Sequence, residues 1–202
     1  MSKKKIFIVS GLLMLFVLLS ILVVFDMTKS FDMTFYNFLM SFRCDALDNY
    51  FVFITKFGDI AFIVGLVIGC LVILRNKFSF LYSCLAIDCA LTNKIVKHII
   101  RRSRPDVLKL IKQGGFSFPS GHSMIAVCMY GYLIYMVNKK FTNKYLKFIS
   151  IFMLVVLIIS IGLSRVYVGV HYISDVIAGY ILALILLILY IELTEKFFCR
   201  GK

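Results

Sequence analysis

The stretch LSRVYVGVHYISDVIAGY, residues 163–180, places three ionisable side chains, Arg165, His171 and Asp175, between two long runs of Leu, Ile and Val. An Arg or Asp at the centre of a bilayer costs about 2.5–3.5 kcal/mol on insertion scales, and such residues usually belong to functional sites. The stretch therefore predicts a site where two membrane-spanning helices end.

The composition around this stretch is that of an integral membrane protein. Of 202 residues, 61% are hydrophobic and 16% are charged, and the mean hydropathy is +0.96, whereas soluble domains contain about 25% charged residues. A helix needs about 20 apolar residues to cross the hydrocarbon core. Six segments approach this length: 6–25, 57–74, 78–96, 122–138, 148–164 and 176–193. We predict an all-α polytopic membrane protein with six transmembrane helices in one bundle, formed by residues 1–202 as a single domain.

The first segment follows Lys3, Lys4 and Lys5, as the core of a secretory signal would. Its apolar run is longer than the roughly 7–15 residues of a signal core, and no small-x-small cleavage site follows it. We interpret it as a retained helix.

The net charge of +13 does not indicate nucleic acid, because the basic residues are spread over helix ends. With the N-terminus in the cytoplasm, twelve of the 23 Lys and Arg residues lie inside and eleven outside. Eight of the outer eleven lie in the predicted site, at Arg165 or between Lys94 and Lys112. Without these eight, twelve basic residues lie inside and three outside. The positive-inside rule then predicts cytoplasmic N- and C-termini and a cell-membrane protein whose site faces the extracytoplasmic side.

Six crossings would bring three polar clusters to one face of the membrane. The first is KHIIRRSRPD, residues 97–106, where Lys97 and Arg104 are two cations near a helix exit that we expect Pro105 to stop. The second is FSFPSGHSM, residues 116–124, where a helix begins at Ser120 and Gly121 with His122 beside it. Free N–H groups at such a helix start bind anions well.

The third cluster is the opening stretch. His171 and Asp175 are four residues apart and share one face of a helix, so the carboxylate can hold one imidazole nitrogen while the other is presented. Each cluster alone has an ordinary explanation: snorkelling cations, a helix cap, a structural His–Asp pair. Cations, N–H donors and two histidines on one face together favour phosphoryl transfer, which depends on positioned donors.

These residues also carry a resemblance. It rests on Lys97, Arg104 and Pro105, then Pro119, Ser120, Gly121 and His122, then Ser164, Arg165, His171 and Asp175. All eleven positions, at these spacings, resemble the three-part signature of the type-2 phosphatidic acid phosphatase superfamily.

The resemblance implies a mechanism. His171 would attack phosphorus and form a phosphohistidine, Asp175 would orient it, and His122 would protonate the leaving oxygen and later activate water. The phosphate would be held by Lys97, Arg104, Ser120, Gly121 and Arg165. The resemblance implies no metal and no other cofactor, and the ten Asp and Glu residues do not cluster near these motifs at ligand spacing.

The remaining polar positions receive other assignments. Residues 26–56 place Phe31, Phe35, Phe38, Leu39, Phe42 and Ala46 at helical spacing, which predicts a helix on the outer leaflet or a lid packed on the bundle. Asp88 is expected to face the bundle interior and pair with a neighbouring helix. His98 matches no signature position, and we expect it to be structural.

The sequence thus predicts a membrane lipid phosphatase whose partners are a lipid phosphate and the bilayer. Phosphatidylglycerophosphate and undecaprenyl pyrophosphate are the first substrate candidates, with lipid A and phosphatidic acid as further ones, and oligomeric state is not specified. A lipid-phosphate binding or transport protein with an altered site is the alternative. A vanadate-dependent haloperoxidase has the same anion pocket, but six apolar segments argue against that soluble group.

Overall fold

Every regular element is a helix in this computed structural model, which describes residues 1–199. In chain order the elements are α1 (Lys3–Val24), α2 (Lys29–Met40), α3 (Asp45–Thr55), the 3-10 turn η1 (Lys56–Gly58), α4 (Ile60–Leu74), α5 (Lys77–Ile100), α6 (Gly121–Lys140), α7 (Lys144–Tyr167) and α8 (Ile173–Cys199). The predicted all-α class is confirmed.

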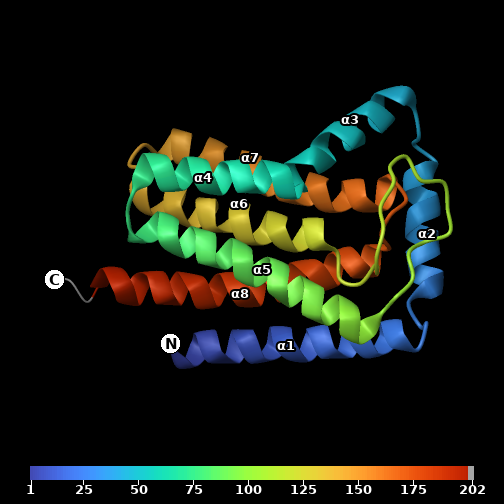
Figure 1. Cartoon of the computed structure of the whole chain (residues 1–202), viewed down its shortest axis with the longest axis horizontal. Helices are drawn as coiled ribbons and strands as arrows, with labels where there is room; N and C mark the ends of the chain where they lie inside the picture. The colour runs from blue at the N-terminus through green and yellow to red at the C-terminus, as the bar shows by residue number, and fades with distance from the viewer. Residues whose placement is uncertain (200–202) are drawn as a thin grey trace.

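The six longest helices run roughly along one axis, with the start of α1 and the end of α8 at the same end (Figure 1). The α4–α5 and α6–α7 turns also lie at that end. Helix α2, the segment 101–120 and the α7–α8 turn lie at the opposite end, which we call the distal end. The alternation of helices thus brings the three polar clusters of the sequence to one end of the bundle.

Each of the six predicted segments forms one helix of the bundle. Helices α1, α7 and α8 are each long and apolar enough to cross a membrane alone. Helix α4 has 15 residues and spans about 22 Å at about 1.5 Å per residue, less than the bilayer core. It is preceded, across a 48° bend, by the helical stretch Asp45–Gly58. The predicted segment 57–74 therefore contains a bend that its apolar composition does not reveal.

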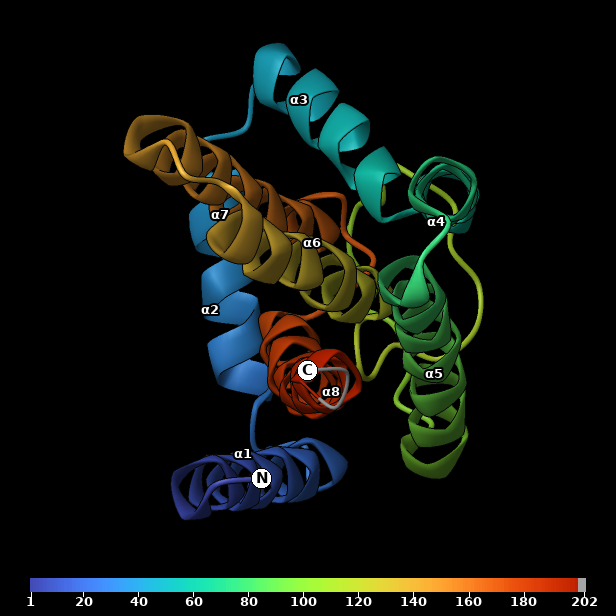
Figure 2. The same cartoon turned by 90° about the vertical axis from the view of Figure 1, so that its left-hand side faces the viewer.

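Helix α6 is the centre of the bundle and packs against α5, α7 and α8 (Figure 2). Its residues Met124, Cys128 and Met129 are fully buried, and they share a core with Leu85 of α5 and Ala183 of α8. A helix that is apolar around its whole circumference is typically a buried one. The first turn of α6, which carries the Ser-Gly-His motif, is therefore held by neighbours on several sides.

The distal segment 26–56 is not the single amphipathic helix expected from its sequence. It divides into α2 and α3, with a break between Met40 and Asp45. On α2, Phe35 and Leu39 pack on the end of α7 and the start of α8, whereas Phe31 and Phe38 are exposed. One part of the apolar stripe of α2 therefore packs on the bundle, and the other part is exposed on its surface.

Helix α5 ends before the predicted stop at Pro105. It ends at Ile100, because Arg101 takes a left-handed conformation with φ 53°. The segment 101–120 then crosses the distal end without regular structure and returns to α6 after a cis Phe118–Pro119 bond. Leu110 N–H donates to the Val168 carbonyl at 3.1 Å, which ties this segment to the α7–α8 turn.

The α7–α8 turn requires glycine at position 169. Gly169 has φ 77°, and a Cβ atom there would lie 2.1 Å from the Leu108 carbonyl oxygen. The left-handed conformation alone costs an L-residue about 1–2 kcal/mol, and the clash would separate the turn from segment 101–120.

We therefore predict that Gly169→Ala lowers the melting temperature of the protein in detergent micelles. Gly11→Ala is the control, because a Cβ on α1 at that position meets no atom within 4 Å and alanine favours helix. Equal melting temperatures for the two variants would contradict this account of the turn.

Candidate active site

Several parts of the chain meet around a cavity of about 490 Å³ near the distal end. The polar side chains come from the end of α5, the segment 101–120, the first turn of α6 and the α7–α8 turn. They are Asn93, Lys97, Arg104, Gln113, His122 and His171, with Gly121 beside them. The two predicted catalytic histidines and two of the three predicted cations thus line one cavity.

His171 is 3% exposed, and the contacts of its ring define its tautomer. Arg104 Nη1 lies 3.2 Å from His171 Nε2. Because a guanidinium only donates, Nε2 must be the unprotonated nitrogen and Nδ1 carries the hydrogen. Burial is the main cause that lowers the pKa of His171 to about 3. The imidazole is therefore neutral near pH 7, with the lone pair of Nε2 toward the cavity.

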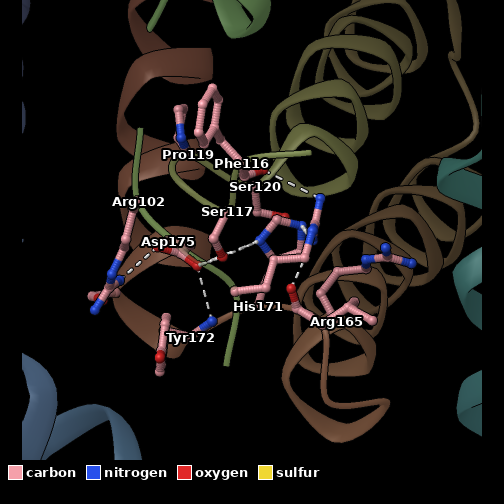
Figure 3. A network of polar contacts seen from close by, with 12 residues as sticks. Arg102, Phe116, Ser117, Pro119, Ser120, Arg165, His171, Tyr172 and Asp175 are labelled. Carbon is pink, nitrogen blue, oxygen red and sulfur yellow. Dashed lines mark hydrogen bonds and ion pairs between the residues drawn. The ribbon is translucent and has the colours of Figure 1, made fainter. Parts of the chain in front are cut away.

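Nδ1 of His171 is held by two groups rather than by Asp175 alone. Ser117 Oγ lies 3.2 Å and Asp175 Oδ2 3.4 Å from Nδ1. Ser117 Oγ donates in turn to Asp175 Oδ2 at 2.5 Å (Figure 3). The hydroxyl thus accepts from the imidazole and donates to the carboxylate. The predicted His–Asp pair is present. Ser117, which was not identified from the sequence, makes the shorter contact with Nδ1.

The Asp175 carboxylate is fully buried, and both of its oxygens are occupied. Oδ2 also accepts the Tyr172 N–H at 2.9 Å, and Oδ1 accepts from Arg102 Nη1 at 2.6 Å. A buried charge is tolerated only when it is paired and hydrogen-bonded. Arg102 and Ser117 therefore satisfy the Asp175 carboxylate, and they lie near the signature positions rather than on them.

Lys97 and Arg104 bind the backbone of segment 114–117. Lys97 Nζ donates to the Phe116 carbonyl at 2.5 Å. Arg104 donates to the carbonyls of Gly114 and Gly115 through Nε and to Val170 through Nη1. Carbonyl oxygens thus partly satisfy both cations.

Arg165 lies behind the cavity. Its side chain is fully buried, with Nη1 donating to Thr55 at 2.6 Å and Nη2 to Gln113, a cavity residue, at 3.0 Å. Its Nε has no hydrogen-bond partner among the described residues. Arg165 is therefore not among the residues that line the cavity, unlike the prediction, but it contacts one of them, Gln113.

His122 is held by an acid that sequence reasoning missed. Its Nε2 lies 2.8 Å from Oδ1 of Asp59, the residue that precedes α4. The neighbouring glycine permits this approach, because a Cβ on Gly58 would lie 2.8 Å from the His122 ring. The bend before α4 therefore places a carboxylate against the second histidine.

The start of α6 differs from the expected set of free amide donors. The Ser120 N–H donates to the Asp175 carbonyl at 3.0 Å, and Ser120 Oγ caps the helix by accepting from Ser123. Ser120 is therefore a fully buried residue that joins α6 to α8, and its amide is not available to an anion in this conformation. Gly121 and His122 are the residues of this turn that line the cavity.

Two polar residues singled out from the sequence lie outside the site. Asp88 accepts a hydrogen bond from the Tyr190 hydroxyl of α8, as expected for an acid inside the bundle. His98 Nδ1 contacts the Lys94 carbonyl on its own helix. Among the side chains that the structure describes, His, Cys, Asp and Glu form no group of three or more that could hold a metal ion.

We predict that the His171 imidazole stays neutral between pH 8 and pH 5. Burial disfavours the protonated form of His171 in the folded protein, whereas the unfolded chain binds this proton with the ordinary histidine pKa of about 6.5. Acidification below that value therefore destabilises the fold. The check is ¹⁵N NMR of histidine-labelled protein in micelles, with His171→Asn used to assign the signal. A His171 titration step within this range would contradict the prediction.

Comparison with known proteins identifies the family of this chain. The profile of the PAP2 superfamily matches residues 77–199. Phosphatidylglycerophosphatase B of Bacillus subtilis (strain 168) is 43% identical over 108 residues, which cover 52% of this chain and 53% of that protein. Lipid phosphate phosphatase delta of Arabidopsis thaliana is 26% identical over 83 residues, 40% of this chain and 20% of that protein. The matched stretch thus spans about half or less of each curated relative.

Solved structures extend the similarity over most of the chain. The crystal structure of a transmembrane PAP2 type phosphatidylglycerolphosphate phosphatase from Bacillus subtilis superposes with a TM-score of 0.85 at 30% identity, covering 93% of this chain and 96% of that one. Aquifex aeolicus LpxE shares the fold, with a TM-score of 0.68 at 21% identity over 80% of this chain and 95% of that one. The predicted family is therefore confirmed, and this chain belongs to the PAP2 superfamily.

Proposed function

We propose that this protein is a lipid phosphatase that hydrolyses a phosphate monoester or pyrophosphate of a membrane lipid through a phosphohistidine. The observation that carries the proposal is the donor contact of Arg104 with Nε2 of His171. This contact presents a neutral imidazole lone pair to a cavity that is also lined by Lys97 and His122. A nucleophile, cations for the phosphoryl oxygens and a second imidazole are the groups that this reaction needs.

In the proposed first step, Nε2 of His171 attacks phosphorus while Arg104 turns its Nη1 donor toward a phosphoryl oxygen. The phosphorus–nitrogen bond forms as the bond to the lipid oxygen breaks, and protonated His122 gives its proton to that oxygen. The ring of His171 becomes cationic. Asp175 and Ser117, which contact Nδ1, offset this charge.

In the second step, neutral His122 takes a proton from water, and the water oxygen attacks phosphorus. The phosphorus–nitrogen bond breaks, inorganic phosphate leaves, and His171 is neutral again. Asp59 Oδ1 lies 2.8 Å from His122 Nε2 and so orients the ring of this proton-transferring residue. Each turnover consumes one water and releases phosphate together with the lipid alcohol from a monoester, or with the lipid monophosphate from a pyrophosphate. These residues account for every proton transfer without a metal, and we propose that the reaction is metal-independent.

The apolar part of the cavity favours a lipid substrate. Below the polar groups it is lined by Ile60, Ile63, Val64, Val67 and Ile68 of α4, by Ser83, Ala86, Ile87, Cys89 and Ala90 of α5, and by Ile125 of α6. Fourteen residues of α5 separate Ser83 from Lys97, about 21 Å at about 1.5 Å per residue. We infer that a tail lies in this slot between α4 and α5 while its phosphate reaches His171.

The relatives narrow the substrate class. The Bacillus subtilis matches are named for phosphatidylglycerolphosphate, so we propose this lipid as the substrate. Undecaprenyl pyrophosphate, the other candidate from the sequence, is the alternative. The whole chain, residues 1–202, would act as one domain of six crossings. The excess of positive charge near the termini and the α6–α7 turn favours a cytoplasmic location for that end, which leaves the distal end and the site outside.

The proposed function predicts that His171→Ala loses phosphate release from each of a panel of lipid phosphates to below detection. Purified wild type, the alanine variant and a wild-type sample containing EDTA are compared. EDTA is expected to leave the wild-type rate unchanged. A variant as fast as wild type would refute the nucleophile, and loss of activity in EDTA would refute the metal-free reaction.

The slot predicts that Ala86→Phe discriminates between substrates by tail length. The added ring fills the space between α4 and α5, so kcat/KM for a long-chain lipid phosphate falls at least about tenfold, while the value for a short-chain soluble analogue is unchanged. Leu91→Phe, on the exposed side of the same helix, is the matched control. Equal losses for both chain lengths would exclude the slot as the tail site.

A further inference from the structure

A chain of ion pairs leads from the catalytic carboxylate to α2. Arg102 Nη1 donates to Asp175 Oδ1 at 2.6 Å, and Arg102 Nη2 donates to Asp32 Oδ2 at 2.7 Å. The Arg102 side chain is 9% exposed and both carboxylates are 0% exposed. Figure 3 shows the Arg102 side chain reaching Asp175 from the side opposite His171. The arginine is thus shared between two buried acids.

The Asp32 end of this chain is firmly held. Ser174, the neighbour of Asp175, donates its N–H to Asp32 Oδ1 at 2.9 Å and its hydroxyl to Asp32 Oδ2 at 2.8 Å. Thr28 Oγ1 accepts from Arg102 Nη2 at 3.1 Å, and the Tyr172 ring lies 4.0 Å from the guanidinium carbon. Both oxygens of Asp32 therefore have partners, and the guanidinium has little freedom to turn.

The charges explain why a second acid is needed. When His171 becomes cationic in the proposed reaction, Asp175 must oppose that charge. Arg102 alone would weaken the negative field of Asp175, because its guanidinium lies within hydrogen-bond distance of the carboxylate. Asp32 offsets Arg102, so two acids and one cation leave one net negative charge for His171. Low-dielectric surroundings make each of these interactions stronger than in water.

We propose that Asp32 and Arg102 are positioning residues for the nucleophile. Arg102 fixes the Asp175 carboxylate against Ser117 and His171, and Asp32 fixes Arg102 and offsets its charge. Helix α2, which contributes no residue to the cavity lining, thereby takes part in the reaction through Asp32. The inference about rate rests on the proposed function, whereas the inference about the orientation and tautomer of His171 does not.

The test compares Asp32→Asn and Arg102→Gln with Asp45→Asn and Arg101→Gln, two exposed residues on the same segments. Asp32→Asn keeps the shape of the side chain but leaves the charge of Arg102 to Asp175 alone. We expect kcat to fall about tenfold, which corresponds to about 1.4 kcal/mol, with KM unchanged. We also expect the ¹⁵N signals of His171 to move away from the Nδ1–H form. Both controls should match wild type in rate and spectrum.

The double variant Asp32→Asn with Arg102→Gln separates action through Arg102 from an independent effect. If Asp32 acts through Arg102, the double variant loses no more kcat than Arg102→Gln alone. Losses that multiply in the double variant would overturn the proposed chain, because independent sites are additive in free energy.

Two further results would overturn the proposal. One is wild-type kcat together with unchanged ¹⁵N signals in Asp32→Asn, and the other is a lower melting temperature with unchanged kcat per folded enzyme. If either variant fails to fold, Thr28→Val, which removes a partner of Arg102 Nη2, is measured in the same way. Absence of phosphate release by wild type would refute the proposed function. The positioning role of Asp32 would then be tested only by comparing the ¹⁵N signals of His171 in wild type and in Asp32→Asn.

Discussion

The distal end of the bundle is organised around the buried negative charge of Asp175. A carboxylate without water requires a cation and hydrogen-bond donors, and removing such partners from a buried charge typically costs several kcal/mol. Asp175 obtains them from Arg102, from the Ser117 hydroxyl and from the Tyr172 N–H. These groups belong to segment 101–120 and to the α7–α8 turn, so neutralising one charge brings separate parts of the chain together.

The contacts around Asp175 also fix the tautomer of the neighbouring His171 imidazole. With Asp175 and Ser117 at Nδ1 and Arg104 at Nε2, only one tautomer of His171 satisfies every contact. Arg104 is in turn oriented by carbonyl oxygens of residues 114 and 115. Segment 101–120 has no regular structure, yet its backbone oxygens hold the cations and its side chains hold the acid. An irregular backbone suits this role, because its carbonyls are not used in a helix.

The second histidine and the apolar slot belong to a different part of the fold. Asp59 reaches His122 from the bend before α4, and the helix that follows the bend lines one side of the slot. The bend therefore positions both the acid that contacts His122 and the helix that lines the apolar slot. The structure that superposes with a TM-score of 0.85 over most of the chain indicates that this arrangement of helices belongs to the superfamily.

The sequence alone determined the helical class, the six apolar segments and the three polar clusters at one end. These follow from local properties, namely the length of each apolar run and the alternation of crossings. The four-residue spacing of His171 and Asp175 likewise predicts their pairing on or near one helix.

The contacts of Ser117 with His171, Asp59 with His122 and Asp32 with Ser174 were decided only by the tertiary structure. They join residues 54, 63 and 142 positions apart, and no period or motif in one sequence relates residues across such distances. The same reason explains why the Ser120 amide, expected to be free for an anion, instead donates to Asp175 of another helix.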